Sequence, residues 1–219
     1  MIETLTLKLK QLILEDNILD DTDYHKAIRS LAEQSIDTPD DKDFTQDEVR
    51  QVVEGFKPRK APGPDGITKE IQQLVYKGLP KTMTVIYNEC LRTGCFPAYW
   101  KTASILPITK PGREDSTDPS KFRRISLINT AGKVLEKLLI KRIMHHLHKS
   151  EFLKENQYGF TPQKNTTDAA LETRKFIEPQ LEKGRIVIMV SLGVRGAFDS
   201  AWWPAILKEL RDAKYPRNL

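Results

Sequence analysis

The chain has 219 residues, 39% of them hydrophobic and 30% charged, with a formal net charge of +5 at pH 7. This length allows one large domain or two small ones, and the apolar runs are too short and too often interrupted by charges to span a bilayer. The N-terminal residues 1–17 also lack the continuous apolar stretch of a secretory signal. We therefore expect a globular intracellular protein with no membrane segment, located in the nucleus or the cytoplasm.

The charge is unevenly distributed along the chain. Residues 15–48 contain twelve acidic residues against three basic ones, a net charge of −9. Because residues 1–14 carry +1 and the whole chain +5, residues 49–219 carry +13. A basic body of this size is typical of proteins that hold phosphate backbones with distributed Lys and Arg. Ordinary solvated helix faces give the same composition, so both interpretations stay open at this point.

The N-terminal residues 1–43 have the pattern of helical pieces that end in a polar linker at 37–43. Thr45 and Glu48 then have the spacing of a capping box, in which each side chain bonds the backbone N–H of the other residue. This pattern opens a predicted helix over 46–56. Its expected buried face consists of Val49, Val52, Val53 and Phe56.

Residues 57–67, with the sequence KPRKAPGPDGI, are too rich in proline and glycine for regular structure. They predict a stiff turn that carries several basic side chains. Helical spacing resumes over 68–76 and again over 80–92, where Gly94 supplies the C-terminal stop.

Two β-rich segments follow, 102–109 and 121–128, joined by a polar loop. They predict a hairpin on which Lys110, Arg123 and Arg124 project toward a shared anion. A guanidinium fork and an ammonium point charge together suit a triphosphate. The alternative is an edge hairpin whose charges only prevent aggregation.

A long helix is predicted over 130–149, followed by a turn at 156–165 and another helix over 166–182. In the first of these helices the apolar residues recur every four positions, and a second face carries lysines. The apolar positions are Leu135, Leu139, Ile143 and Leu147, and the lysines are Lys133, Lys137 and Lys141.

The chain then predicts a buried strand over 185–192, a turn that contains Gly193, and a helix over 200–214. Ser200 is the expected N-cap of this helix. The backbone N–H groups of Gly196 and Ala197 open toward the helix and suit phosphate oxygens. Beside them, Phe198 packs either on a nucleotide or into the core, and Asp199 is either a metal ligand or a helix cap.

Cysteines and histidines give no sign of a metal centre. Cys90 and Cys95 lack a second pair or a His spacing, which indicates reduced thiols without a disulfide partner. His145, His146 and His148 have no carboxylate or thiol nearby in sequence. A zinc site needs such a ligand set, so we expect surface histidines near a helix C-terminus.

Taken together, five runs and their order resemble the reverse transcriptases of non-LTR, LINE-type retrotransposons, particularly those of arthropods. The runs are KAPGPDGI at 60–67, FPAYWKTASILPITKPG at 96–112, FRRISLINTAGKVLEKLLIKRI at 122–143, NQYGFTPQKNTTDAA at 156–170 and VSLGVRGAFDSAWWPAIL at 190–207. The resemblance implies an α+β, partial right-hand polymerase fold: helix-rich fingers with a basic hairpin, and the N-terminal part of a palm with an incomplete sheet. Residues 44–219 would form this truncated reverse transcriptase domain, and residues 1–43 a helical connector upstream of it.

The resemblance also implies roles for individual residues. Lys110 and Arg123 would hold the incoming dNTP, the amides of Gly196 and Ala197 would contact its phosphates, and Phe198 would be the aromatic gate against the sugar. Backbone contacts to the RNA template and the DNA primer would come from Lys101, Lys133 and Lys137. The sequence departs from the family pattern at two positions of the fingers: Arg124 replaces a proline, and Asn165 replaces a serine.

Gly193 is the departure with a chemical consequence. The family's palm strand ends there in an aspartate that binds Mg²⁺ together with two aspartates of a later hairpin, and two-metal phosphoryl transfer needs these oxygens. With Gly193 in that place, and with no later Asp-Asp hairpin or thumb expected, we predict a catalytically inactive chain that does not bind Mg²⁺ productively. The alternative is a non-catalytic remnant that binds RNA or DNA.

Overall fold

The computed structural model describes residues 16–34, 36–112, 118, 121–149, 154–194, 197–198 and 200–219. The chain divides into two compact units, one formed by Met1–His145 with Trp202–Leu219 and the other by His146–Ala201. The described residues before position 44 lie in the first unit. The expected boundary between a connector and a polymerase domain at residue 43 stays a prediction.

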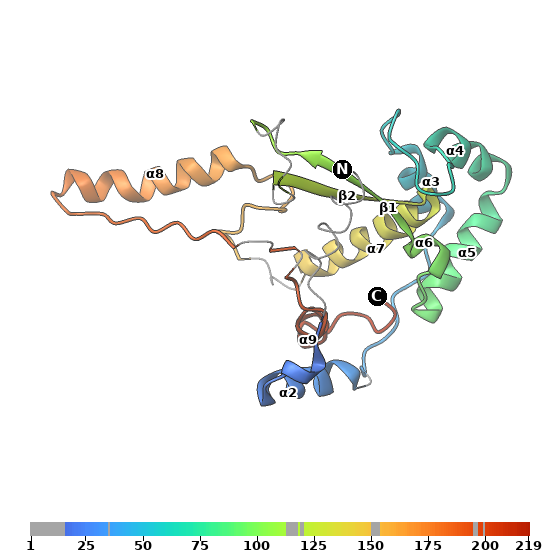
Figure 1. Ribbon diagram of the computed structural model, residues 1–219, viewed down its shortest axis with the longest axis horizontal. Coiled ribbons are helices and arrows are strands. Elements are labelled where there is room, and N and C mark those ends of the chain that lie inside the picture. The colour runs from blue at the N-terminus through green and yellow to red at the C-terminus, as the bar shows by residue number, and fades with distance from the viewer. Residues whose placement is uncertain are drawn as a thin grey trace. The chain divides into compact units, whose positions relative to one another are not determined.

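The described residues are mostly helical, with one antiparallel pair of strands (Figure 1). In chain order the elements are η1 (Ile18–Asp20), α2 (Asp23–Glu33), α3 (Gln46–Glu54), α4 (Lys69–Gly78), α5 (Pro80–Thr93), α6 (Ala98–Lys101), β1 (Ala103–Thr109), β2 (Phe122–Ile128), α7 (Thr130–Lys149), α8 (Thr166–Glu182) and α9 (Trp203–Asp212). The predicted helix-rich fold and the hairpin are confirmed. None of the described helices combines the length and the apolar character needed to cross a bilayer.

Helix boundaries follow the local signals in the sequence. The Thr45 side chain accepts the N–H of Glu48 at 3.1 Å, and Glu48 accepts the N–H of Thr45 at 2.8 Å, so the predicted capping box opens α3. At the end of α5, Gly94 adopts the left-handed conformation with φ of 60°, which glycine enters without a Cβ clash. Capping boxes also open α2, between Thr22 and His25, and α8, between Asn165 and Asp168.

The hydrophobic core of the first unit lies where α3, α4, α5 and α7 meet. Its buried members are Phe44, Val49, Val52, Val53, Tyr76, Tyr87, Leu91, Val134, Leu135 and Leu138. The expected apolar face of α3 is confirmed, with Phe56 partly buried at its end. On α7 the buried face is formed by Val134, Leu135 and Leu138, with Leu139 only partly buried.

Asn88 of α5 fixes the point where the chain enters this core. Its side-chain oxygen accepts the N–H of Phe44 at 2.6 Å, and its amide nitrogen donates to the carbonyl of Phe44 at 3.0 Å. Both residues are buried. A buried backbone group must find a partner, and here one side chain satisfies both backbone groups of Phe44.

Arg142 of α7 connects Asp41 and Glu48 to the same core. Its Nε and Nη2 donate to the two oxygens of Glu48 at 3.1 and 3.0 Å, and its Nη1 donates to Asp41 at 3.1 Å. The guanidinium also lies 5.3 Å from the ring centroid of Phe44. Desolvation tends to raise the pKa of Glu48, but hydrogen bonds from the Thr45 backbone and from Arg142 outweigh it and lower that pKa.

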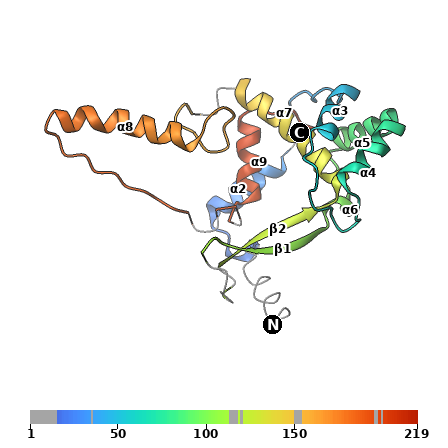
Figure 2. The same cartoon turned by 90° about the horizontal axis from the view of Figure 1, so that it is seen from above.

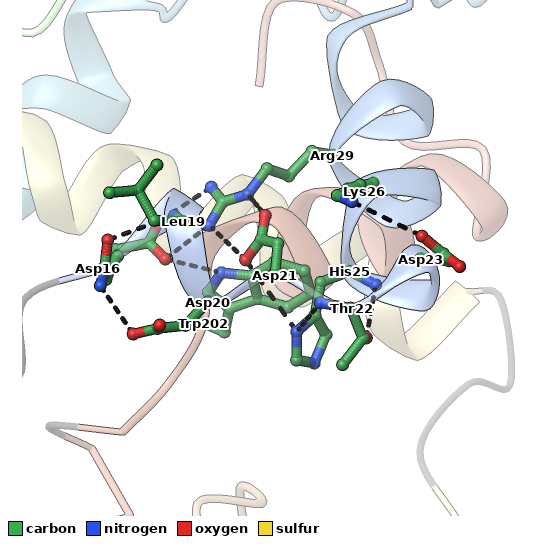
Figure 3. Close-up of polar contacts among 11 residues, drawn as sticks. Asp16, Leu19, Asp20, Asp21, Thr22, Asp23, His25, Lys26, Arg29 and Trp202 are labelled. Carbon is green, nitrogen blue, oxygen red and sulfur yellow. Dashed lines mark hydrogen bonds and ion pairs between the residues drawn. The ribbon is translucent and has the colours of Figure 1, made fainter.

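Helices α2 and α9 lie side by side, as Figures 1 and 2 both show. Figure 3 shows the polar cluster beside them, in which Arg29 of α2 donates to Asp16 at 2.9 Å and to Asp21 at 2.5 Å. The Trp202 indole donates to Asp16 at 3.2 Å, and its ring centroid lies 5.1 Å from the Arg29 guanidinium. The cluster joins Asp16 and α2 to Trp202, the N-cap of α9.

The strand predicted over 185–192 does not form, and this prediction is wrong. Residues 185–194 have no regular structure, and Ile186, Ile188 and Leu192 are more than 80% exposed. A strand exists only through hydrogen bonds to a neighbouring strand, which an apolar sequence cannot supply by itself. In the part of the chain that is described, the sheet contains β1 and β2 alone, so the expected palm sheet is absent there.

Ser200 is not the N-cap of the last helix, because α9 begins at Trp203 and its N-cap is Trp202. A helix capped by Ser200 would place Pro204 at its fourth position. That residue has to donate the first intrahelical hydrogen bond, and proline has no N–H. Pro204 instead occupies the first turn of α9, where proline is well tolerated.

We predict that Asn88→Ala destabilises the protein by about 2–4 kcal/mol, because two buried backbone groups of Phe44 lose their partner. The measurement is the urea unfolding midpoint at constant slope. Thr93→Ala serves as the control, since its hydroxyl bonds the Glu89 carbonyl at an exposed site, and it should cost less than about 0.5 kcal/mol. Equal shifts for the two variants would contradict this account of Asn88.

Candidate nucleotide and nucleic-acid interface

The hairpin places Lys110 and Arg123 on one face. In the β1–β2 register Ile108 lies opposite Arg123, and the Lys110 N–H continues the ladder by donating to the Lys121 carbonyl at 2.8 Å. Side chains alternate between the faces of a strand, so Lys110 follows Ile108 on the face that carries Arg123. Both cationic side chains are exposed. Their common face supports the expectation that they share an anion.

Arg124 lies on the other face of the hairpin, opposite Pro107. The sequence interpretation had grouped Arg124 with Lys110 and Arg123, and the register corrects this. Adjacent residues of a strand point to opposite faces, so Arg123 and Arg124 do not converge on one ligand from the same strand. The pair Lys110 and Arg123 remains as the candidate anion site.

The basic turn at 57–67 is fixed to the junction between β2 and α7. Asn129 accepts the N–H of Asp65 at 3.3 Å and donates to the carbonyl of Tyr99 at 3.1 Å. The Thr130 hydroxyl donates to the carbonyl of Ile67 at 2.5 Å. Both Asn129 and Thr130 are buried, so they anchor the turn from inside the protein.

Gly63 allows the turn to approach this junction closely. A Cβ added at Gly63 would lie 2.5 Å from the backbone nitrogen of Asn129 and 2.5 Å from the carbonyl carbon of Ile128. Only glycine fits such an approach without moving the backbone. On the outer side of the turn, Lys57, Arg59 and Lys60 are exposed. The turn thus has exposed cations in its first half and an anchored backbone in its second half.

The lysines expected to contact nucleic acid have different environments. Lys101 is exposed at the end of α6. The ammonium group of Lys133 donates to the carbonyl of Ala61 at 3.1 Å, and that of Lys137 lies 4.4 Å from the ring centroid of Phe56. Lys133 and Lys137 are thus engaged within the chain. Whether any of the three also contacts a phosphate stays a prediction.

In the second unit, Phe198 is 81% exposed and meets Phe160 edge to face, with ring centroids 5.7 Å apart at 88°. This arrangement excludes the core-packing alternative for Phe198 and leaves an exposed aromatic pair. Ala197 lies in the same turn, whereas Gly196 and Asp199 lie outside the described residues.

Gly193 lies in the irregular segment 185–194 of the same unit. A Cβ added there meets nothing within 4 Å, and the residue has no positive φ. Glycine is therefore not required at this position by a close approach or by a left-handed backbone.

Sequence reasoning missed Asn129, Thr130, Gly63 and Phe160. A polar Asn-Thr pair between an apolar strand and a helix is a detectable signal, because such residues need buried partners. The close approach at Gly63 carries no local signal beyond the proline and glycine content of the turn. Phe160 stands in a predicted turn, where a large aromatic residue is itself unusual.

Comparison with known proteins connects these features to a family. Residues 108–219 match the family model described as reverse transcriptase (RNA-dependent DNA polymerase). The chain is 35% identical over 172 residues to the retrovirus-related Pol polyprotein from type-1 retrotransposable element R1 of Bradysia coprophila. This alignment covers 78% of this chain and 17% of that protein. It is 32% identical over 173 residues to the RNA-directed DNA polymerase from mobile element jockey of Drosophila funebris, covering 79% of this chain and 19% of the relative. The chain thus spans less than a fifth of these relatives, and the resemblance to arthropod elements is confirmed.

We predict that Gly63→Ala releases the turn at 57–67, because the new methyl group would overlap the backbone of the β2–α7 junction. Overpacking of this kind costs about 1–3 kcal/mol, and the freed turn should be cut faster by trypsin after Arg59 and Lys60. Gly78→Ala is the matched control, since its added Cβ meets nothing within 4 Å. A Gly63→Ala variant that is as stable and as slowly cut as the unsubstituted chain would refute the anchoring of the turn.

Proposed function

This chain belongs to the reverse transcriptase (RNA-dependent DNA polymerase) family of non-LTR retrotransposons, and we propose that it binds polymerase ligands without transferring nucleotides. The reaction of such a polymerase is the template-directed addition of a dNTP to a DNA primer on an RNA template. The observation that carries the proposal is Gly193, which lies within the matched range where the resemblance leads us to expect a palm aspartate.

The proposed ligand contacts belong to the fingers. Lys110 and Arg123 would take the triphosphate, because an ammonium and a guanidinium on one face offer a point charge and a fork to its oxygens. Their common side of the hairpin supports this assignment. Phe198, with Ala197 and Gly196 beside it, would meet the sugar and the phosphates. The exposure of Phe198 supports its access to a ligand.

Catalysis would fail at the metal. Mg²⁺ takes oxygen ligands, usually with one or two carboxylates from the protein, and two-metal transfer places such ligands beside the attacking and leaving oxygens. Gly193 supplies only backbone groups, so the residues described around it do not fit this ligand set. No step of nucleotide transfer is therefore assigned to this chain.

The second candidate function is nucleic-acid binding alone, and the turn at 57–67 favours it. Lys57, Arg59 and Lys60 are exposed beside the part of the turn that Asn129 and Thr130 hold in place. Contact with a phosphate backbone would therefore order these side chains but not the anchored part of the turn. This function and the loss of catalysis are compatible in one chain.

Primer extension tests the loss of catalysis. The purified chain, supplied with an RNA template, a DNA primer, dNTPs and Mg²⁺, should give no extended primer above a protein-free reaction. A full-length active reverse transcriptase in the same buffer is the positive control. Incorporation by the purified chain would sink the proposal of inactivity.

Salt dependence tests the binding. If the three cations of the turn and Arg123 each neutralise one phosphate, a slope of about −0.7 per phosphate predicts a roughly fifty-fold loss of single-strand affinity between about 50 and 200 mM salt. Replacing Lys57, Arg59 and Lys60 with Gln should flatten most of that slope. The same replacement at Lys77, Lys81 and Lys183 changes the net charge equally and should leave the slope nearly unchanged. A flat dependence for the unsubstituted chain would count against nucleic-acid binding.

A further inference from the structure

Three arginines of the basic body already hold carboxylates of the connector and α3. We call these carboxylates the acidic strap; its members are Asp40, Asp41, Asp43 and Glu48. Arg217 donates to both oxygens of Asp40 at 2.9 and 2.8 Å. Arg92 binds both oxygens of Asp43, and Arg142 binds Asp41 and Glu48. The acidic strap thus pairs with α5, α7 and the C-terminal residues of the described chain.

The geometry of these pairs is the geometry of phosphate recognition. Arginine meets carboxylate and phosphate alike through two parallel N–H···O bonds. Asp40 and Asp43 accept such forked pairs from Arg217 and Arg92. The Arg217 hydrogen bond lowers the pKa of Asp40, so the pair is ionised at neutral pH. A phosphate could reach these guanidinium edges only by displacing a carboxylate.

We infer that the acidic strap competes with nucleic-acid phosphate for Arg92, Arg142 and Arg217 and thereby confines the polyanion to the basic turn and the hairpin. This inference rests on the proposed nucleic-acid binding. Within the described residues, no carboxylate forms an ion pair with the side chains of Lys57, Arg59 or Lys60, whereas Arg92, Arg142 and Arg217 all pair with carboxylates. Residues 49–219 carry a net charge of +13, but some of their basic side chains are already paired with carboxylates and are therefore not accessible to a ligand.

Asp40 and Asp43 are the members of the acidic strap that can be tested without damage to the core. The Arg92–Asp43 pair is 57% and 46% exposed and the Arg217–Asp40 pair 61% and 45%, whereas Arg142 is only 16% exposed. Exposed pairs of this kind contribute little to folding. Removing their acids should therefore free two arginines while the fold persists.

The test compares a double variant, which carries both Asp40→Asn and Asp43→Asn, with the unsubstituted full chain. The probe is an unstructured single-stranded RNA of about 20 nucleotides, and the readout is fluorescence anisotropy across a KCl series. Two freed arginines should steepen the salt slope by about 1.4, which adds a roughly seven-fold loss of affinity between about 50 and 200 mM salt. The variant should also bind more tightly at the lowest salt concentration.

The matched control is Asp23→Asn with Glu33→Gln, which removes the same charge from the same N-terminal segment. In the described part of the chain the ion-pair partner of Asp23 is Lys26, so this control raises the net charge without freeing an arginine. If the double variant has the same salt slope as the control, the acidic strap does not compete with phosphate.

Adding Arg92→Gln and Arg217→Gln to the double variant should restore the original slope. If the double variant does not fold, as judged by circular dichroism, Asp43→Asn alone should still steepen the slope by about 0.7.

The two proposals fail in distinguishable ways. RNA binding by the double variant but not by the unsubstituted chain would contradict the proposed function and support the acidic strap. If the unsubstituted chain binds RNA and the double variant has the same salt slope as the control, the proposed function is supported and the acidic strap is contradicted. Absence of binding in every form overturns both, because freed arginines would then add no phosphate contact.

Discussion

Asn129 and Thr130 hold three otherwise separate parts of the first unit at one point. They stand where β2 ends and α7 begins, and their buried side chains bond backbone groups of Asp65, Ile67 and Tyr99. A buried polar group that loses its partner costs about 1–3 kcal/mol, so the turn, α6 and α7 cannot separate without that penalty. A turn of prolines and glycines thus gains a fixed position from two side chains that lie outside it.

This anchoring decides which cations can meet a ligand. Lys133 and Lys137 face the anchored turn and the Phe56 ring beside it, and Arg142 is surrounded by acids. Exposed cations include Lys57, Arg59 and Lys60 of the turn and Lys110 and Arg123 on one face of the hairpin. A net charge counts all of them equally, whereas binding depends on the few whose donors are directed toward solvent.

The parts of the fold that the sequence predicted depend on local interactions. Thr45 and Glu48 lie three residues apart, the hairpin joins neighbouring segments, and Gly94 ends α5 through its own backbone freedom. The segment 185–192 failed because a strand needs a partner that composition does not identify. For α9, the missing N–H of Pro204 outweighed the capping preference of Ser200. Of the candidate site, the common face of Lys110 and Arg123 was predictable from strand alternation, but the anchoring of the turn depends on pairs more than 60 residues apart.

The fold of the described chain does not require a glycine at position 193. A glycine demanded by the backbone would have a positive φ or a neighbour within reach of its Cβ, and Gly193 has neither. A side chain as large as that of aspartate would therefore fit on the same backbone. The contacts that anchor the turn and build the hairpin lie in the other unit and involve no atom of Gly193. The basic turn and the hairpin can therefore form whichever residue stands at position 193.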